Sequence, residues 1–149
     1  VSSTRIRTLL AEHRLAEAAE LLGRPYSISG RVVHGRKEGR TIGFPTANIH
    51  LGRRRVPISG IFAVRVHGIA GHPLPGSAYV GSRPVIEDDQ IVLEVHLFDF
   101  DEDIYGRRIE VEFVGWIRDD LALGSMAELK AQIARDNADA RRILATAAA

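Results

Sequence analysis

The sequence contains no cysteine among its 149 residues. Disulfide bonds, catalysis by a thiolate and zinc held by cysteine are therefore excluded, and a reducing compartment is compatible with this composition. The chain also lacks any apolar run near the roughly 20 residues needed to span a bilayer. It does not open with a basic segment followed by an apolar one, as a secretory signal does. We expect a soluble cytoplasmic protein that does not associate with membranes.

An excess of charge of one sign is lacking as well. Lys and Arg total 20 against 19 Asp and Glu, which leaves a formal net charge of +1. Nucleic-acid binding through bulk charge is therefore not expected, although the run Arg53–Arg55 keeps a local basic patch open as a weaker alternative. The length favours one domain, and 45% hydrophobic residues supply a core. The chain starts at Val1 rather than Met, which is compatible with a piece of a longer protein.

Helical patterns lie at the two ends of the chain. Apolar residues at helical spacing predict helix over 3–22, with His13-Arg14 as a point where two short helices separate, and Gly23 and Pro25 end the pattern. A second helix is predicted over 125–145, where Ser125 and Glu128 have the spacing of a capping box.

The region between the helices, residues 26–118, has the patterns of short strands. Several of these strands without intervening helices predict a mainly β fold, a closed or nearly closed antiparallel barrel. The candidate strands lie near 28–33, 61–66, 77–81, 91–98 and 109–113, and the turn signals are His72-Pro73, Pro75-Gly76 and Tyr105-Gly106.

A glycine-rich segment follows the first candidate strand of this region. Backbone N–H groups in such a turn can surround an anion, and neighbouring basic side chains add charge that suits phosphate. The segment is not a Walker A loop, because the Gly-Lys-Ser/Thr ending is missing, and a plain hairpin is the competing interpretation. The glycines are Gly35, Gly39 and Gly43, and the basic residues are Arg36, Lys37 and Arg40.

Thr46 and Asn48 follow two residues apart, so in an extended segment they project to the same side. Their hydroxyl and amide oxygens are hard neutral ligands, which can join phosphate oxygens and water around Mg²⁺. The alternative is that both side chains only stabilise a turn.

Glu94 interrupts a strand in which both faces are largely apolar. A carboxylate in such a strand is either paired, placed at a rim or functional, and one role that suits it is that of a general base. An exposed position on the outer face of the barrel is the alternative.

Taken in order, these motifs make the chain resemble the riboflavin kinase domain of bacterial bifunctional FAD synthetases. The resemblance covers almost the whole chain, and its most specific part is Gly43-Phe44-Pro45-Thr46-Ala47-Asn48. The other matches are Leu22–Tyr26, Gly30-x-Val32-Val33-x-Gly35, Gly39-Arg40, Gly60–Val64, Glu94–Phe100, Tyr105-Gly106, Val111–Phe113, Ile117-Arg118 and Gln132-Ile133-x-x-Asp136.

The resemblance implies a six-stranded antiparallel Greek-key barrel with a C-terminal helix. It implies transfer of the γ-phosphoryl group of ATP to the 5′-hydroxyl of riboflavin, which gives FMN and ADP, with Mg²⁺ as the metal. It also implies roles for single residues. Glu94 is the base, and Arg118 and Leu123 lie on the flavin side. The nucleotide phosphates are bound by Gly35, Gly39, Arg40, Gly43, Pro45, Thr46 and Asn48. Of these, Thr46 and Asn48 also bind the metal.

The segment Ser2–Arg7 resembles the last nucleotide-binding motif of the adenylyltransferase domain that precedes the kinase domain in this family. We therefore interpret residues 1–22 as a helical remnant or linker from that domain, and residues 23–149 as the kinase domain. The adenylyltransferase domain is then the partner in the parent protein, and this chain by itself should make no FAD.

Three positions depart from the family pattern. Tyr79 and Val85 stand where the family usually has Asn and Thr, and Leu123 stands where it usually has Phe. These changes leave open a second function, a catalytically weak module that binds flavin or nucleotide.

Overall fold

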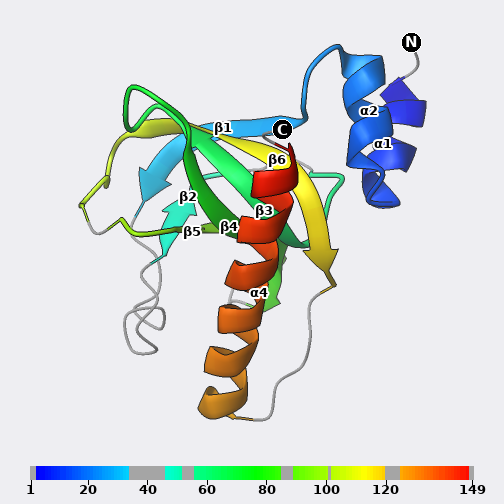
Figure 1. Ribbon diagram of the computed structural model, residues 1–149. Helices are drawn as coiled ribbons and strands as arrows, with labels where there is room; N and C mark the ends of the chain where they lie inside the picture. The colour runs from blue at the N-terminus through cyan, green and yellow to red at the C-terminus, as the bar shows by residue number, and fades with distance from the viewer. Residues whose placement is uncertain are drawn as a thin grey trace.

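The computed structural model describes residues 3–33, 46–51, 56–84, 89–100, 102–119 and 125–147. Within them it forms a β-barrel with two short helices before it and one long helix after it (Figure 1). The elements are α1 (Ser3–Ala11), α2 (Leu15–Leu22), β1 (Ser27–Val33), β2 (Ala47–Ile49), β3 (Gly60–His67), β4 (Leu74–Pro84), β5 (Asp89–Leu97), β6 (Arg108–Arg118) and α4 (Met126–Ala147).

The six strands close into a barrel in the order β1-β2-β5-β4-β3-β6, with every neighbouring pair antiparallel. The consecutive strands β3, β4 and β5 lie side by side, and β6 returns to pair with β3. This is the Greek-key order, so the predicted mainly β Greek-key barrel is confirmed.

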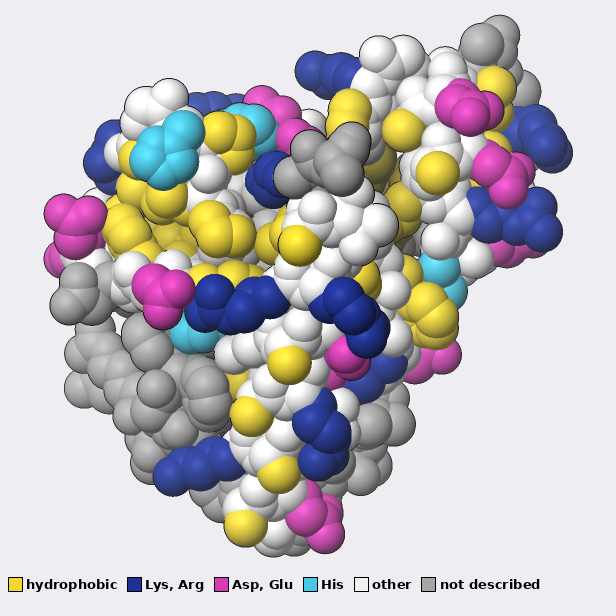
Figure 2. Space-filling model, viewed as in Figure 1, with side chains coloured by type: hydrophobic (Ala, Val, Ile, Leu, Met, Phe, Trp, Pro, Cys, Tyr) yellow, Lys and Arg dark blue, Asp and Glu magenta, His cyan; other side chains and the backbone are white. Residues whose placement is uncertain are grey.

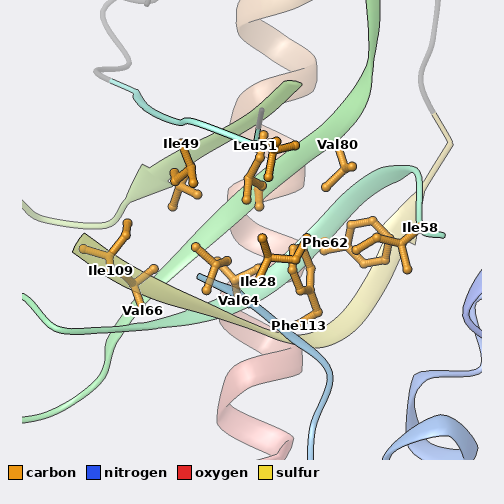
Figure 3. Packing of buried hydrophobic residues seen from close by; sticks show 14 of the residues in the cluster. Ile28, Ile49, Leu51, Ile58, Phe62, Val64, Val66, Val80, Ile109 and Phe113 are labelled. Atoms are coloured by element: carbon orange, nitrogen blue, oxygen red, sulfur yellow. The ribbon is translucent and has the colours of Figure 1, made fainter. Parts of the chain in front are cut away.

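The barrel is filled by the inward side of each strand (Figure 3). On β5, Leu93, Val95 and Leu97 are buried in the core while the residues between them point outward. The ring of Phe113 packs edge-on against Phe62, with centroids 5.3 Å apart. The two-residue alternation predicted for 91–98 is therefore correct, and it fixes which side chains of β5 reach the outer surface.

Helix α4 lies against the outside of β3, β4 and β6 (Figure 1). Ala140 and Leu144 of the helix form a second buried cluster with Ala63 and Phe98 of the barrel. At the start of the helix the Glu128 backbone N–H donates to Ser125 Oγ at 3.1 Å, as the capping box predicts. The outer surface of the barrel is therefore covered by α4 on one side.

The space-filling view shows basic side chains along the exposed face of α4 (Figure 2). Three of its arginines contact acidic or amide groups: Arg135 donates to Gln132, Arg141 pairs with Asp99, and Arg142 pairs with Asp139. These contacts make the α4 surface mixed in charge. No helix in the described ranges is both long and apolar enough to cross a membrane.

The helical segment before the barrel divides where the sequence predicts, at His13. Gly23 ends α2 with a φ of 79°, and its N–H donates to the Ala19 carbonyl at 2.8 Å. The imidazole of His13 stacks on Trp116 of β6, with centroids 4.3 Å apart, and its Nε2 lies 3.4 Å from Asp119 Oδ1. The two helices are thus attached to the end of β6.

The strand predicted over 77–81 is too short, because β4 runs from Leu74 to Pro84. The turn that the sequence predicts at Pro75-Gly76 is wrong, since Gly76 pairs with Leu97 inside the sheet. A Cβ at Gly76 would lie 2.5 Å from the His96 carbonyl oxygen. This glycine therefore serves the close approach of β5 rather than a turn.

Candidate active site

Glu94 lies on the outer face of the barrel, near the middle of β5 (Asp89–Leu97). Its neighbours Leu93 and Val95 are each 1% exposed and point into the core, so the Glu94 side chain points the opposite way. It is half-buried there. Glu94 therefore points to the outer face but is not fully exposed there, and its role as a general base stays a prediction.

Asn48 lies directly opposite Glu94 in the antiparallel ladder between β2 and β5. Its neighbour Ile49 is buried in the core, so Asn48 also points outward, and it is half-buried like Glu94. Directly opposite side chains on one face lie about 5 Å apart. The structure therefore brings together an amide and a carboxylate that are 46 residues apart in the sequence.

Thr46 is exposed and comes immediately before β2. Hydroxyl, amide and carboxylate oxygens are all hard donors, and Mg²⁺ in phosphoryl-transfer sites uses few protein ligands together with substrate phosphates. Thr46, Asn48 and Glu94 fit this donor chemistry. Among the described residues, no group of three or more His, Cys, Asp and Glu is placed to hold a metal by itself.

Tyr79 of β4 lies directly opposite Glu94 on the side away from Asn48. The next residues in the same row are Ile61 of β3 and Arg118 at the end of β6. The row across the outer face therefore reads Asn48, Glu94, Tyr79, Ile61 and Arg118. At about 4.8 Å per strand, Glu94 and Arg118 are about 14 Å apart along the sheet.

Arg118 forms a bidentate ion pair with Asp136 of α4. Its Nε donates to Asp136 Oδ1 at 2.9 Å and its terminal nitrogen to Oδ2 at 2.8 Å. The Asp136 carboxylate is buried and also accepts from Gln132 Nε2 at 3.0 Å. Arg118 thus attaches the helix to the barrel, and its role on the flavin side stays a prediction.

In the sequence, Asp136 stands only as the last residue of the motif Gln132-Ile133-x-x-Asp136, which carries no predicted role. The sequence feature that points to Asp136 is the spacing Gln132-x-x-x-Asp136, which places both side chains on one face of a helix. Arg118 becomes their partner only through the docking of α4 on the barrel. The spacing of residues within the helix does not predict this docking.

The remaining predicted site residues lie outside the described residues. These are Gly35, Gly39, Arg40, Gly43 and Pro45 of the phosphate side, Leu123 of the flavin side, and the alternatives Val85 and Arg53–Arg55. Their roles stay predictions.

Comparison with known proteins identifies the family of this chain. The model of the family "Flavokinase: Riboflavin kinase" matches residues 22–144. The bifunctional riboflavin kinase/FMN adenylyltransferase of Escherichia coli (strain K12) is 52% identical over 141 residues, which is 95% of this chain and 45% of that protein.

Two solved structures are similar in fold. Riboflavin kinase from Trypanosoma brucei superposes with a TM-score of 0.59 at 25% identity, covering 80% of this chain and 77% of that one. A crystal structure named macrolide-efflux protein, from Streptococcus pneumoniae, superposes with a TM-score of 0.84 at 38% identity, covering 95% of this chain and 46% of that one.

The chain thus spans a little under half the length of the curated relatives that it matches. Its match to the family model runs from the end of α2 into the last turns of α4, through all six strands. The chain belongs to the riboflavin kinase family, as a domain homologous to the kinase half of bifunctional riboflavin kinase/FMN adenylyltransferases.

Proposed function

We propose that this chain transfers the γ-phosphoryl group of ATP to the 5′-hydroxyl of riboflavin and releases FMN and ADP. The observation that carries the proposal is the register of β2 and β5, which sets Asn48 directly opposite Glu94 on the outer face. Phosphoryl transfer needs positioned groups and neutralised charge more than covalent help from the protein. Strands on a closed barrel hold such groups rigidly.

In this proposal Glu94 accepts the proton of the riboflavin hydroxyl as its oxygen bonds to the γ-phosphorus. The bond from that phosphorus to the β-γ bridging oxygen breaks, and ADP leaves with the electron pair. Thr46 and Asn48 would hold Mg²⁺, which supplies neutralisation of phosphate charge when it is bound. The Gly35–Gly43 segment would surround the phosphates through its backbone N–H groups.

The proposal includes an N-terminal adenylyltransferase domain as partner in the parent protein, because the bifunctional relatives are more than twice as long as this chain. It places the reaction in the cytoplasm, where ATP is supplied. It assigns residues 1–22 to the connection between the two domains.

A turnover assay tests the proposal. The 149-residue chain is incubated with riboflavin, ATP and Mg²⁺, and flavins are separated by chromatography. We expect FMN and ADP in equal amounts, no FAD, and no product when EDTA replaces Mg²⁺. If riboflavin stays unphosphorylated while the protein is folded by circular dichroism, the proposed activity is wrong.

One observation favours a second function. Tyr79, which replaces the family's usual Asn, lies directly beside Glu94 rather than at a distance from it. If that change blocks turnover, the chain is a module that binds flavin or nucleotide without phosphorylating. Riboflavin or ADP binding together with absence of FMN would identify this case.

A further inference from the structure

The side chain of Tyr79 lies along strand β4 and over Gly81. Residues 79 and 81 share the outer face, because the core residues Ala78 and Val80 point inward beside them. A Cβ at Gly81 would lie 2.6 Å from Tyr79 Cζ and would also contact its hydroxyl oxygen. The three atoms nearest to that Cβ all belong to Tyr79. Gly81 therefore provides the space that the phenol ring occupies.

Tyr79 neighbours Glu94 in the sheet on the side opposite Asn48, and its ring extends from there along β4 toward Gly81. Tyr79 is opposite Glu94 in the β4–β5 ladder, and Asn48 is opposite Glu94 in the β2–β5 ladder. Beyond the ring, Ile61 is also directed outward and is only 9% exposed. Between Glu94 and Arg118, the row therefore carries the half-buried Tyr79 and the largely buried Ile61, and no charged side chain.

The geometry of phosphoryl transfer indicates from which side the acceptor reaches Glu94, and this step rests on the proposed function. The attacking and leaving oxygens lie roughly in line through the transferred phosphorus. If the nucleotide phosphates lie on the side of β2, where Thr46 and Asn48 are, the acceptor hydroxyl reaches Glu94 from the side of β4. The rest of the acceptor then extends over Tyr79.

We propose that Tyr79, seated on Gly81, is an acceptor-positioning residue against which riboflavin packs. Aromatic rings offer a large contact area to another flat aromatic system. A flavin packed against the ring would extend its ribityl chain across the β4–β5 ladder to Glu94. Tyr79 is therefore assigned to flavin affinity and specificity, and it takes no part in nucleotide binding.

The test separates the two substrates. Tyr79→Ala is expected to raise the KM for riboflavin about tenfold, and to raise the Kd for riboflavin measured by flavin fluorescence by a similar factor. The KM for ATP should stay within twofold. Tyr79→Phe, which keeps the ring, should stay within threefold in every constant. Tyr105→Ala, which removes an exposed tyrosine from the turn before β6, is the matched control and should change none of them.

Gly81 gives an independent variant that leaves Tyr79 in place. Gly81→Ala should displace the ring and raise the riboflavin KM several-fold. In the Tyr79→Ala background the same change should add less than twofold, because the clash is with Tyr79 itself. If Tyr79→Ala fails to fold by circular dichroism, Gly81→Ala with its riboflavin titration decides the question.

Failure of this inference is distinguishable from failure of the proposed function. If the wild-type chain makes FMN but Tyr79→Ala leaves the riboflavin Kd and KM unchanged, or raises the ATP and riboflavin constants equally, the positioning role is wrong. If the wild type makes no FMN, the riboflavin titration still decides: an affinity that depends on Tyr79 supports the role. An affinity independent of Tyr79, or no binding, overturns it.

Discussion

Asn48 and Glu94 face each other across the β2–β5 ladder, on the outside of a closed barrel. Each side chain is flanked by residues that the core holds, namely Ile49 beside Asn48 and Leu93 with Val95 beside Glu94. Moving either residue out of this pairing would need a slip in register, which would turn core residues out to water. The core therefore fixes the two backbone positions opposite each other, and the first two predictions concern these two residues.

Glu94→Gln is expected to lower kcat by about 100-fold or more, because the amide cannot accept the hydroxyl proton while it keeps the size of the carboxylate. Steady-state kinetics with saturating riboflavin and ATP measure this. Glu20→Gln, on the exposed side of α2, is the control. A loss smaller than threefold would rule out Glu94 as the base.

Asn48→Ala is expected to weaken binding of ADP about tenfold in the presence of Mg²⁺, since it removes one polar partner of a charged ligand. Isothermal titration calorimetry measures the Kd directly. With EDTA in place of Mg²⁺ the variant and the wild type should differ much less. Unchanged ADP affinity and an unchanged KM for ATP would show that Asn48 is not a ligand.

Asp136→Ala is expected to lower the free energy of unfolding by about 3 kcal/mol, because it leaves the Arg118 guanidinium, whose side chain is only 19% exposed, without its carboxylate. The melting temperature should fall by roughly 10 °C. Asp139→Ala removes the exposed pair with Arg142 and should cost less than about 1 kcal/mol. Equal losses in the two variants would contradict the anchoring role of Arg118 and Asp136.

The Arg118–Asp136 ion pair joins α4 to a residue that is predicted to lie on the flavin side. If Arg118 contributes to riboflavin binding, Arg118→Lys should raise the riboflavin Kd several-fold, because lysine cannot hold both carboxylate oxygens in the same plane. Asp136→Asn should raise it in parallel. A normal riboflavin Kd in a folded Arg118→Lys protein would confine Arg118 to a structural role.

His13→Ala should loosen the N-terminal helices from the barrel, since the imidazole stacks on Trp116 at 4.3 Å. Loss of a stacked pair costs about 1 kcal/mol. Trp116 is the single tryptophan of the chain, so tryptophan fluorescence comes from this side chain alone. We expect its emission to shift to longer wavelength, while an unchanged spectrum and stability would show that the stack does not hold the helices.

Much of the fold could be predicted from local pattern. The alternation over 91–98 placed Leu93, Val95 and Leu97 inside, and the break at His13-Arg14 separated two helices, because both depend on neighbours close in sequence. The predicted turn at Pro75-Gly76 is wrong for the opposite reason. The close approach of His96, twenty residues further along the chain, explains that glycine, and no local pattern contains it.

The sequence by itself determined the residue types of the site and the periods that turn Asn48 and Glu94 away from their apolar neighbours. A two-residue period is a property of the extended backbone, so it needs no partner strand. Only the tertiary structure decided which side chains meet. Closure of the barrel sets the register that places Asn48, Glu94 and Tyr79 in one row, and the docking of α4 joins Arg118 to Asp136. Both depend on packing between segments distant in the chain, which the order of residues alone does not specify.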